Sequence, residues 1–294
     1  MTDDSFRWLV DQPRLVDPVL IVMLTGWIDA GGAALAAVDA IHDEAATSPI
    51  IEFDDDTYVD YRARRPVMEL REGLHSVLHW ERITLSVGTD QTGRDLLVLS
   101  GPEPDMAWHR FTRLVGDLAS ILGVSHMVHL GAYPFAVPHT RSPRLSVSSP
   151  SQDVLARVPF LRSSIDVPAG VAAALEREMH DRGIPSLGVW AQVPHYIAAM
   201  AYPAASVALL DGLREATQVV IDATALRSEV LVQGRRLDGM ISGNDEHAKM
   251  IDQLEQIYDA SDDVVDVIDG GPSMELASGD ELAAELEQFL RDQD

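Results

Sequence analysis

Short apolar runs alternate with segments of helical periodicity along most of this chain. Four runs have the length and composition of buried strands, and each leads into a polar loop. These runs are 19–24, 96–99, 127–130 and 187–191. Helical spacing of apolar residues follows them at 31–45, 105–122, 169–181 and 204–216. Repeated strand, loop and helix units predict a three-layer α/β/α fold around a largely parallel or mixed sheet.

The remaining segments modify this plan. A run at 50–53 after the first helix predicts a βαβ unit, and 58–87 shows period-two stretches typical of an antiparallel insertion or sheet extension. After residue 218 the pattern favours helices at 223–232 and 246–260, joined by a turn-rich segment at 234–243. We therefore expect an α/β domain over 1–220 and a helical region over 221–294.

The C-terminal segment is strongly acidic. Residues 252–294 contain 14 acidic side chains and one basic side chain, Arg291. Within them, 274–289 places apolar residues at helical spacing, which predicts an acidic amphipathic tail helix that docks through its apolar side.

Composition excludes several classes of function. The formal net charge is -25, which opposes binding to nucleic acid or to anionic membranes. The chain contains no cysteine, so thiolate metal sites, disulfides and cysteine nucleophiles are ruled out. No apolar run reaches the roughly 18 residues of a membrane span, and the first residues do not resemble a signal peptide. We expect a cytoplasmic protein without a cofactor or a metal site.

Candidate chemistry lies in the loops after the four strands, since ligands of open α/β sheets bind at the carboxyl ends of parallel strands. The first loop offers Gly26, Asp29 and Gly31 as ligand-binding residues, with backbone N–H groups at the start of a helix. It lacks the lysine of a P-loop and the glycine spacing of a dinucleotide fingerprint. Asp29 is either a candidate acid or base or, more simply, a cap of the following helix.

The second loop contributes Gly101 and Glu103. Pro104 and Asp105 have the pattern of a helix start, whereas Glu103, between two prolines, has no evident local role. Glu103 is therefore the better candidate for an acid or base, although a solvated loop carboxylate is the simpler interpretation. We expect its replacement by alanine to leave stability nearly unchanged.

Histidines follow the last two strands. His139 and Arg141 bring a proton-transfer group and an anion-binding group onto one proline-stiffened loop, and His195 follows the fourth strand. If His139 and His195 meet Glu103 and Asp29, the four could form a catalytic pocket. Most loop histidines, however, are exposed or only hydrogen-bonded.

The segment 56–66 interleaves acids, tyrosines and arginines. Tyr58, Asp60, Arg62 and Arg65 suit pairing between arginine and carboxylate groups across an oligomer interface, which we favour over ligand binding.

Four of these segments together resemble the PAC2 family, the relatives of proteasome assembly chaperone 2, in its longer actinobacterial form. They are 26–31, 58–66, 101–111 and 130–141. The resemblance spans about residues 5 to 260. It implies a fold similar to that of nucleoside phosphorylases and nucleoside hydrolases, followed by a small helical region. It also implies a tendency to form homo-oligomers, of which a trimer is one option. Some family members dock on proteasomes through a hydrophobic-Tyr-x tail, which the ending 289–294 does not match. The resemblance supplies no catalytic residues.

Three functions remain open from the sequence. The first is a non-catalytic oligomeric assembly or interaction protein, with proteasome subunits as candidate partners. The second is an enzyme of glycosidic hydrolysis or phosphorolysis that uses the loop cluster. The third is a ligand-binding protein that uses the same pocket without turnover. A closed pocket containing the four candidate side chains would favour the second over the first.

Overall fold

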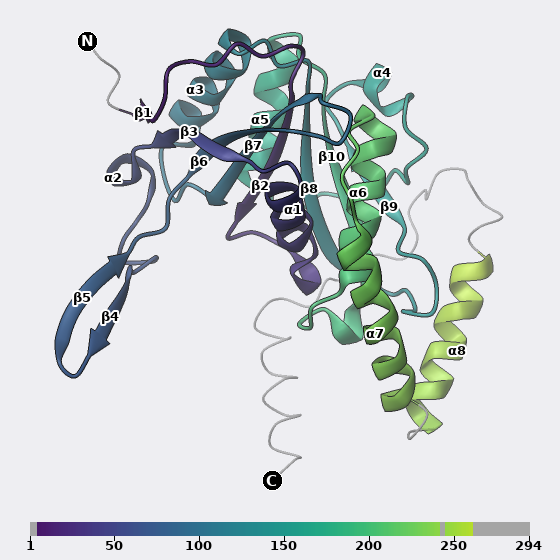
Figure 1. Cartoon of the computed structure of the whole chain (residues 1–294). Helices are drawn as coiled ribbons and strands as arrows, with labels where there is room; N and C mark the ends of the chain where they lie inside the picture. The colour runs from purple at the N-terminus through teal and green to yellow at the C-terminus, as the bar shows by residue number, and fades with distance from the viewer. Residues whose placement is uncertain (1–4, 242–244, 261–294) are drawn as a thin grey trace.

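The computed structural model describes residues 5–241 and 245–260, and a mixed sheet of eight strands forms its centre (Figure 1). The strand order is β1-β3-β6-β7-β2-β8-β10-β9. The bounds of these strands are β1 Phe6–Trp8, β2 Val19–Thr25, β3 Ser48–Phe53, β6 Thr84–Thr89, β7 Asp95–Pro102, β8 His126–Phe135, β9 Leu145–Ser148 and β10 Ser186–Pro194. The α/β architecture expected from the sequence is confirmed.

The parallel centre of the sheet consists of the four strands predicted from the apolar runs. β7, β2, β8 and β10 pair in parallel, in registers such as Ile21 with Val98 and Ile21 with Val128. Antiparallel strands extend this centre at both ends: β6, β3 and β1 on one side and β9 on the other. β2, α1 and β3 form the predicted βαβ unit, since β3 runs parallel to β2 in the same sheet, but the two strands are not neighbours because β6 and β7 lie between them.

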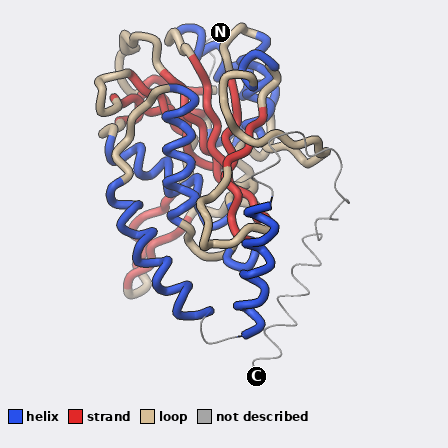
Figure 2. The backbone as a smooth tube through the Cα atoms, turned by 90° about the vertical axis from the view of Figure 1, so that its right-hand side faces the viewer, coloured by secondary structure: helices blue, strands red, loops and turns tan. Residues whose placement is uncertain are grey.

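Helices cover both faces of the sheet (Figure 2). Because β2 is buried on both sides, its successive side chains divide between two cores. Ile21 and Met23 pack with α1 and α6, whereas Leu20 and Val22 pack with α3 and α5. The helices are α1 Ala33–Glu44, α2 Asp55–Tyr58, α3 Trp108–Ile121, α4 Gln152–Leu155, α5 Val171–Asp181, α6 Pro203–Thr217, α7 Thr224–Ile241 and α8 Asp245–Ala260, with the short turns η1 Ala30–Gly32 and η2 His195–Ile197.

Two helix predictions need correction. α3 begins at Trp108 rather than at Asp105, because Ala107 adopts a left-handed conformation (φ 58°) that ends the preceding loop. α7 continues to Ile241 through Gly234 and Gly239, where a turn was expected. Isolated glycines lower helix stability by only about 1 kcal/mol each, and α7 is held by its packing on α6.

The insertion expected at 58–87 is a separate hairpin followed by β6. β4 Val67–Arg71 and β5 Leu74–His79 pair only with each other and project away from the body (Figure 1). Their turn residues, Glu72 and Gly73, both have positive φ, which is the conformation of a tight two-residue hairpin.

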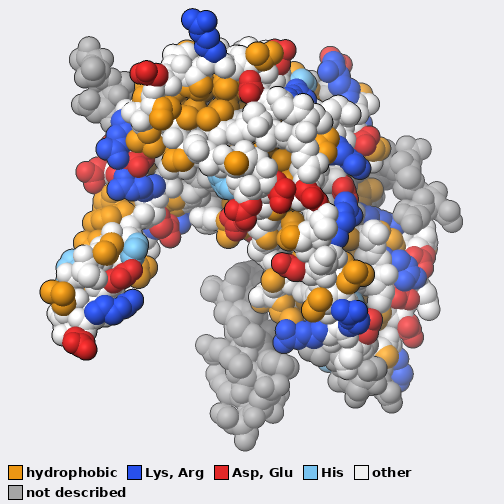
Figure 3. Space-filling model, in the orientation of Figure 1, with side chains coloured by type: hydrophobic (Ala, Val, Ile, Leu, Met, Phe, Trp, Pro, Cys, Tyr) orange, Lys and Arg blue, Asp and Glu red, His pale blue; other side chains and the backbone are white. Residues whose placement is uncertain are grey.

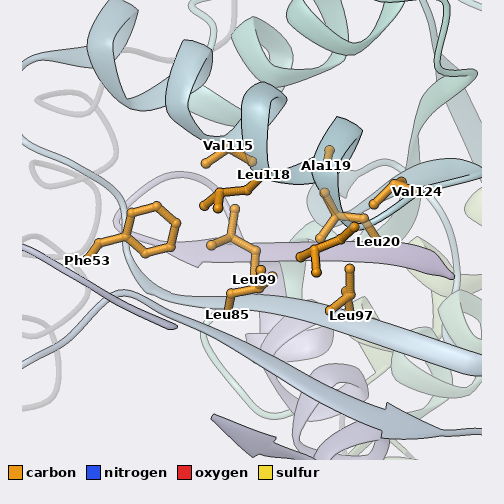
Figure 4. Close-up of a pocket in the computed structure, with 10 residues that line it drawn as sticks. Leu20, Phe53, Leu85, Leu97, Leu99, Val115, Leu118, Ala119 and Val124 are labelled. Atoms are coloured by element: carbon orange, nitrogen blue, oxygen red, sulfur yellow. The ribbon is translucent and has the colours of Figure 1, made fainter. Parts of the chain in front are cut away.

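The core between the sheet and α3 contains a void of about 10 Å³ (Figure 4). Only apolar side chains line it, Leu99, Val115 and Leu118 among them. Without polar partners such a void holds neither an ordered water nor a polar ligand, so it is a packing feature. The predicted tail helix at 274–289 lies outside the described residues.

Candidate functional site

The loops that follow the four parallel strands meet at one edge of the sheet, as expected for parallel strands. The backbone N–H of Glu103 donates to the carbonyl of Thr25 at 2.6 Å, which joins the loops after β7 and β2. Asp29 forms an isolated bridge with Ala132 of β8. The loops after β8 and β10 meet where the backbone N–H of His139 donates to the hydroxyl of Tyr196 at 2.8 Å.

Asp29 caps α1, the simpler of its two interpretations from the sequence. Its Oδ1 accepts from the backbone N–H of Ala34 at 2.8 Å, and its Oδ2 accepts from that of Leu35 at 3.1 Å. These are orphan donors of the first helical turn, which the carboxylate satisfies. Burial raises the pKa of Asp29, and the backbone hydrogen bonds partly oppose this rise.

Glu103 has a structural role that the sequence did not reveal. Its Oε1 accepts from the backbone N–H of Val171, the first residue of α5. Gly170 precedes this helix, and a Cβ there would approach Glu103 Oε1 to 3.1 Å and Trp27 Cδ1 to 3.0 Å. The glycine therefore gives the carboxylate access to the end of the helix, and the role of Glu103 comes from a segment 68 residues away rather than from its own loop.

Asp105 does not start a helix but anchors the segment that leads to the hairpin. Its carboxylate accepts from the Nε of Arg64 at 3.1 Å and from the backbone N–H of Asp60 at 2.9 Å. Arg64 also lies against Gly26, where a Cβ would come within 2.5 Å of its Nη2. Arg64 was not singled out from the sequence, although it lies in the segment predicted as an interface.

The helix N-termini of α1 and α5 thus already carry carboxylates of this chain. A helix N-terminus attracts anions because of its free N–H groups and its dipole. Asp29 and Glu103 accept hydrogen bonds from N–H groups at these two helix N-termini, and their carboxylates add negative charge there. A phosphate group would meet carboxylates there, which disfavours phosphorolysis at this edge.

The glycines predicted to bind a ligand make close contacts within the chain. The N–H of Gly31 donates to the carbonyl of Ala198 at 2.7 Å, and its carbonyl accepts from the N–H of Tyr202 at 3.1 Å. At Gly101 (φ 126°) a Cβ would come within 2.2 Å of the carbonyl oxygen of Arg82. The glycines allow close packing of the loops, so close packing accounts for them without a ligand.

Tyr196 holds His139 through two contacts. Its hydroxyl oxygen accepts from the backbone N–H of His139 at 2.8 Å and is also hydrogen-bonded to Nδ1 of the ring at 2.8 Å. The other ring nitrogen, Nε2, is buried and lies 3.7 Å from Oδ1 of Asp238 in α7. Burial lowers the pKa of His139, and the nearby charge of Asp238 opposes this shift.

Arg141 binds α8 rather than an open site. It pairs with Glu255, Nη1 to Oε1 at 3.1 Å, and with Asp259. Arg144 lies over the ring of Tyr258 at 3.6 Å from its centroid. The acids Glu255 and Asp259 were missed from the sequence, yet their spacing of four residues places them on one helix face, and that was the available signal.

His195 is exposed, and its Nδ1 lies 3.4 Å from the carbonyl oxygen of Phe135. In the described part of the chain, no hydrogen bond joins any two of Asp29, Glu103, His139 and His195. The predicted loops therefore lie together at this edge of the sheet, but these four side chains do not form hydrogen bonds with one another. Their catalytic role stays a prediction.

The residues predicted for an interface differ in exposure. Tyr58 is fully buried and packs on Phe111, with ring centroids 5.2 Å apart, so its side chain belongs to the core. Its assignment to a surface is wrong because α2 turns it inward beneath β3. Arg62 and Arg65 are exposed, and Asp60 is half-buried at the base of the hairpin.

The chain matches a known protein family over most of its length. The PAC2 family matches residues 23–239, a range that includes all four loops and most of α7. This chain belongs to the PAC2 family. The PAC2 match also includes the hairpin and the segment at its base.

Several solved structures are similar to this chain over most of its length. A Corynebacterium glutamicum protein of unknown function is 31% identical, with a TM-score of 0.82, over 88% of this chain and 98% of that chain. A Mycobacterium tuberculosis protein of unknown function is 30% identical, with a TM-score of 0.82, over 90% and 94%. A proteasome-assembly chaperone homologue from the same organism is 29% identical, with a TM-score of 0.73, over 79% and 99%. No curated protein matches the sequence.

Within residues 5–241 and 245–260, no helix combines the length and the apolar character needed to cross a membrane.

Proposed function

We propose that this PAC2 protein works in the cytoplasm as a homo-oligomeric assembly or interaction protein. Its family and its likeness to a proteasome-assembly chaperone homologue support a role in binding other proteins. The observation that carries the proposal is the projecting hairpin β4–β5, whose apolar side chains have no cover within the described chain.

The two faces of this hairpin differ in character. Antiparallel partners share a face, and the register pairs Met68 with Leu78 and Leu70 with His75. Met68, Leu70 and Leu78, with His75 beside them, form the apolar hairpin face, on which Met68 is 49% exposed and Leu70 is 52% exposed. The opposite face carries Glu69, which contacts Nε2 of His79 at 2.6 Å and lies 3.8 Å from Nη2 of Arg71. It also exposes the apolar side chains of Val67, Val77 and Leu74, so the two faces differ in charge rather than in apolar exposure.

Both faces of the hairpin expose apolar side chains, and the apolar hairpin face is the one without acidic or arginine side chains. A hairpin of two strands is marginally stable alone in water, and every residue of β5 is exposed. Figure 3 shows hydrophobic side chains along this projection. Contiguous exposed apolar surface of this kind marks interaction sites.

A second copy of the chain is the partner that fits. Two copies with a net charge of -25 repel each other, so they associate best through surfaces without charged side chains. The apolar hairpin face meets this condition. Arg62 and Arg65 at its base can pair with acids of the neighbour, as the sequence predicted for an interface. A contact of this kind can close into a ring, for which a trimer is one solution.

Light scattering on the full chain tests the proposal. The wild type should have a mass that is a multiple of 32.1 kDa, and the double variant M68K/L78K should fall to the mass of one chain. Val67→Lys, on the opposite face, is the matched control and should remain oligomeric. A single-chain mass for the wild type, or equal dissociation by Val67→Lys, would contradict self-association through this face.

The likeness to a proteasome-assembly chaperone homologue suggests the proteasome as a candidate partner. Incubation of the full chain with purified 20S particles, followed by sedimentation, should recover both together. A chain that stays in the supernatant across the concentrations tested would restrict the proposal to other protein partners.

A further inference from the structure

A groove of about 290 Å³ lies between α1 and the ends of β2 and β7. Its floor is apolar and includes Met23, Val38 and Pro102, while Leu35 stands at the rim. The backbone of Gly101 forms one wall and lies close to Arg82 and Ile83, the residues that lead into β6. The groove is concave and partly enclosed, as small-molecule sites are, and its volume is near the lower end of their range.

The charges around this groove are unbalanced. Arg82 lines it, but its Nη1 is paired with Oε1 of Glu52. Glu81 lies 3.9 Å from Nη1 of Arg64, whose Nε is bonded to Asp105. Its carboxylate is therefore only weakly neutralised.

Asp39 is the second acid of the lining. Within the described part of the chain it has no hydrogen bond or ion pair, and it is exposed on α1. Figure 3 shows acidic side chains gathered over α1. The rim thus presents two carboxylates that lack a strong internal cation.

The inner wall is polar and fixed in place. His42 bridges two hydroxyls, with Nδ1 2.5 Å from Oγ1 of Thr47 and Nε2 3.2 Å from Oγ of Ser100. The ring therefore has both nitrogens engaged and does not supply a free cation. The hydroxyls of Ser100 and Thr25 retain acceptor capacity toward the groove.

We propose that this groove binds a small organic cation, an amine carrying a short apolar chain. The apolar chain would cover the floor formed by Met23, Val38 and Pro102, and the ammonium would lie toward Asp39 and Glu81. An ammonium offers three N–H donors, which match two carboxylates and a hydroxyl. The net charge of -25 further favours a cation over an anion of the same shape.

Calorimetric titration of the full chain with hexylamine and with hexanol tests this assignment. The two probes have the same apolar chain and differ in charge. Hexylamine should bind saturably and about tenfold more tightly than hexanol, since two carboxylate contacts each contribute a modest factor. Equal affinity for the two probes, or no saturable binding of hexylamine, would overturn the proposal.

Variants locate the site. Asp39→Asn and Glu81→Gln should each weaken hexylamine binding about three- to fivefold. Glu44→Gln removes an exposed charge from the same helix without touching the groove and should leave binding unchanged. If Glu44→Gln weakens binding as much as Asp39→Asn, the attraction is a general charge effect and the groove is not the site. Light scattering on the same samples reports self-association independently, so the two proposals fail separately.

Discussion

The guanidinium of Arg141 holds the carboxylate of Asp259 through two parallel hydrogen bonds, Nε to Oδ1 at 2.9 Å and Nη2 to Oδ2 at 2.8 Å. The hydrogen bonds from Arg141 lower the pKa of Asp259 below its ordinary value. This pair joins the loop after β8 to α8, two segments far apart in the sequence. Its geometry is the planar, two-point recognition for which arginine is suited.

Replacing Arg141 by alanine should loosen α8 without unfolding the body. α8 contacts the loop at 140–144 mainly through polar and charged groups, so hydrogen exchange in α8 should become several-fold faster. High salt should have the same effect on the wild type, because exposed ion pairs are screened. Arg177→Ala, which removes an ion pair with Asp181 on α5, is the control and should leave exchange in α8 unchanged.

Replacing Glu103 by alanine should destabilise the fold by about 1 kcal/mol, the usual cost of losing a helix cap, rather than leave stability nearly unchanged as expected from the sequence. The reason is its hydrogen bond from the N–H of Val171, which begins α5. Glu103→Gln keeps an acceptor there and should lose less. Chemical denaturation of the three proteins measures the difference, and equal stability of all three would mean that the capping contact contributes nothing.

Asp29 should make stability depend on pH in a defined direction. Burial raises its folded pKa above the ordinary value of 3.8, so the folded chain takes up this proton before the unfolded chain does. Its contribution to the free energy of unfolding is therefore fully present below pH 3.8 and is lost as pH rises through the folded pKa. The free energy of unfolding of the wild type, measured relative to that of Asp29→Asn, should rise as pH falls through this window. A flat difference across the window would contradict the raised pKa.

Gly101→Ala should be far more costly than Gly73→Ala. Both glycines have positive φ, 126° and 84°, so both variants carry backbone strain. Only at Gly101 would the new Cβ meet backbone, the carbonyl oxygen of Arg82 at 2.2 Å, whereas at Gly73 nothing lies within 4 Å. We expect a loss of about 3 kcal/mol or more for Gly101→Ala and about 1 kcal/mol for Gly73→Ala. Thermal unfolding compares them, and similar melting temperatures would contradict the close contact.

The sequence predicted local structure where a single physical pattern dominates. The four apolar runs became the parallel strands because buried parallel strands are apolar on both faces. It failed at α7, where two glycines indicated a turn but packing on α6 maintains the helix. It also failed at Tyr58, since the aromatic and charged pattern around it does not reveal which side chain turns inward.

The location of the candidate site was predicted more accurately than the role of each of its side chains. Parallel strands ensure that their following loops share an edge, so Asp29, Glu103 and His139 were expected on neighbouring loops. The partner of each side chain depends on distant segments. Val171, Tyr196 and Asp238 lie 57 or more residues away from the groups that they contact.

The sequence by itself determined the α/β layers, the common edge of the loops, the acidic charge and the lack of thiol chemistry, because periodicity and composition act over short stretches of chain. Only the tertiary structure decided that Asp29 and Glu103 cap helices, that Arg141 binds α8 and that the hairpin stands apart with an apolar face. A carboxylate or a guanidinium takes its role from the group that the fold brings within about 3 Å, and neighbours in space are not encoded in local sequence.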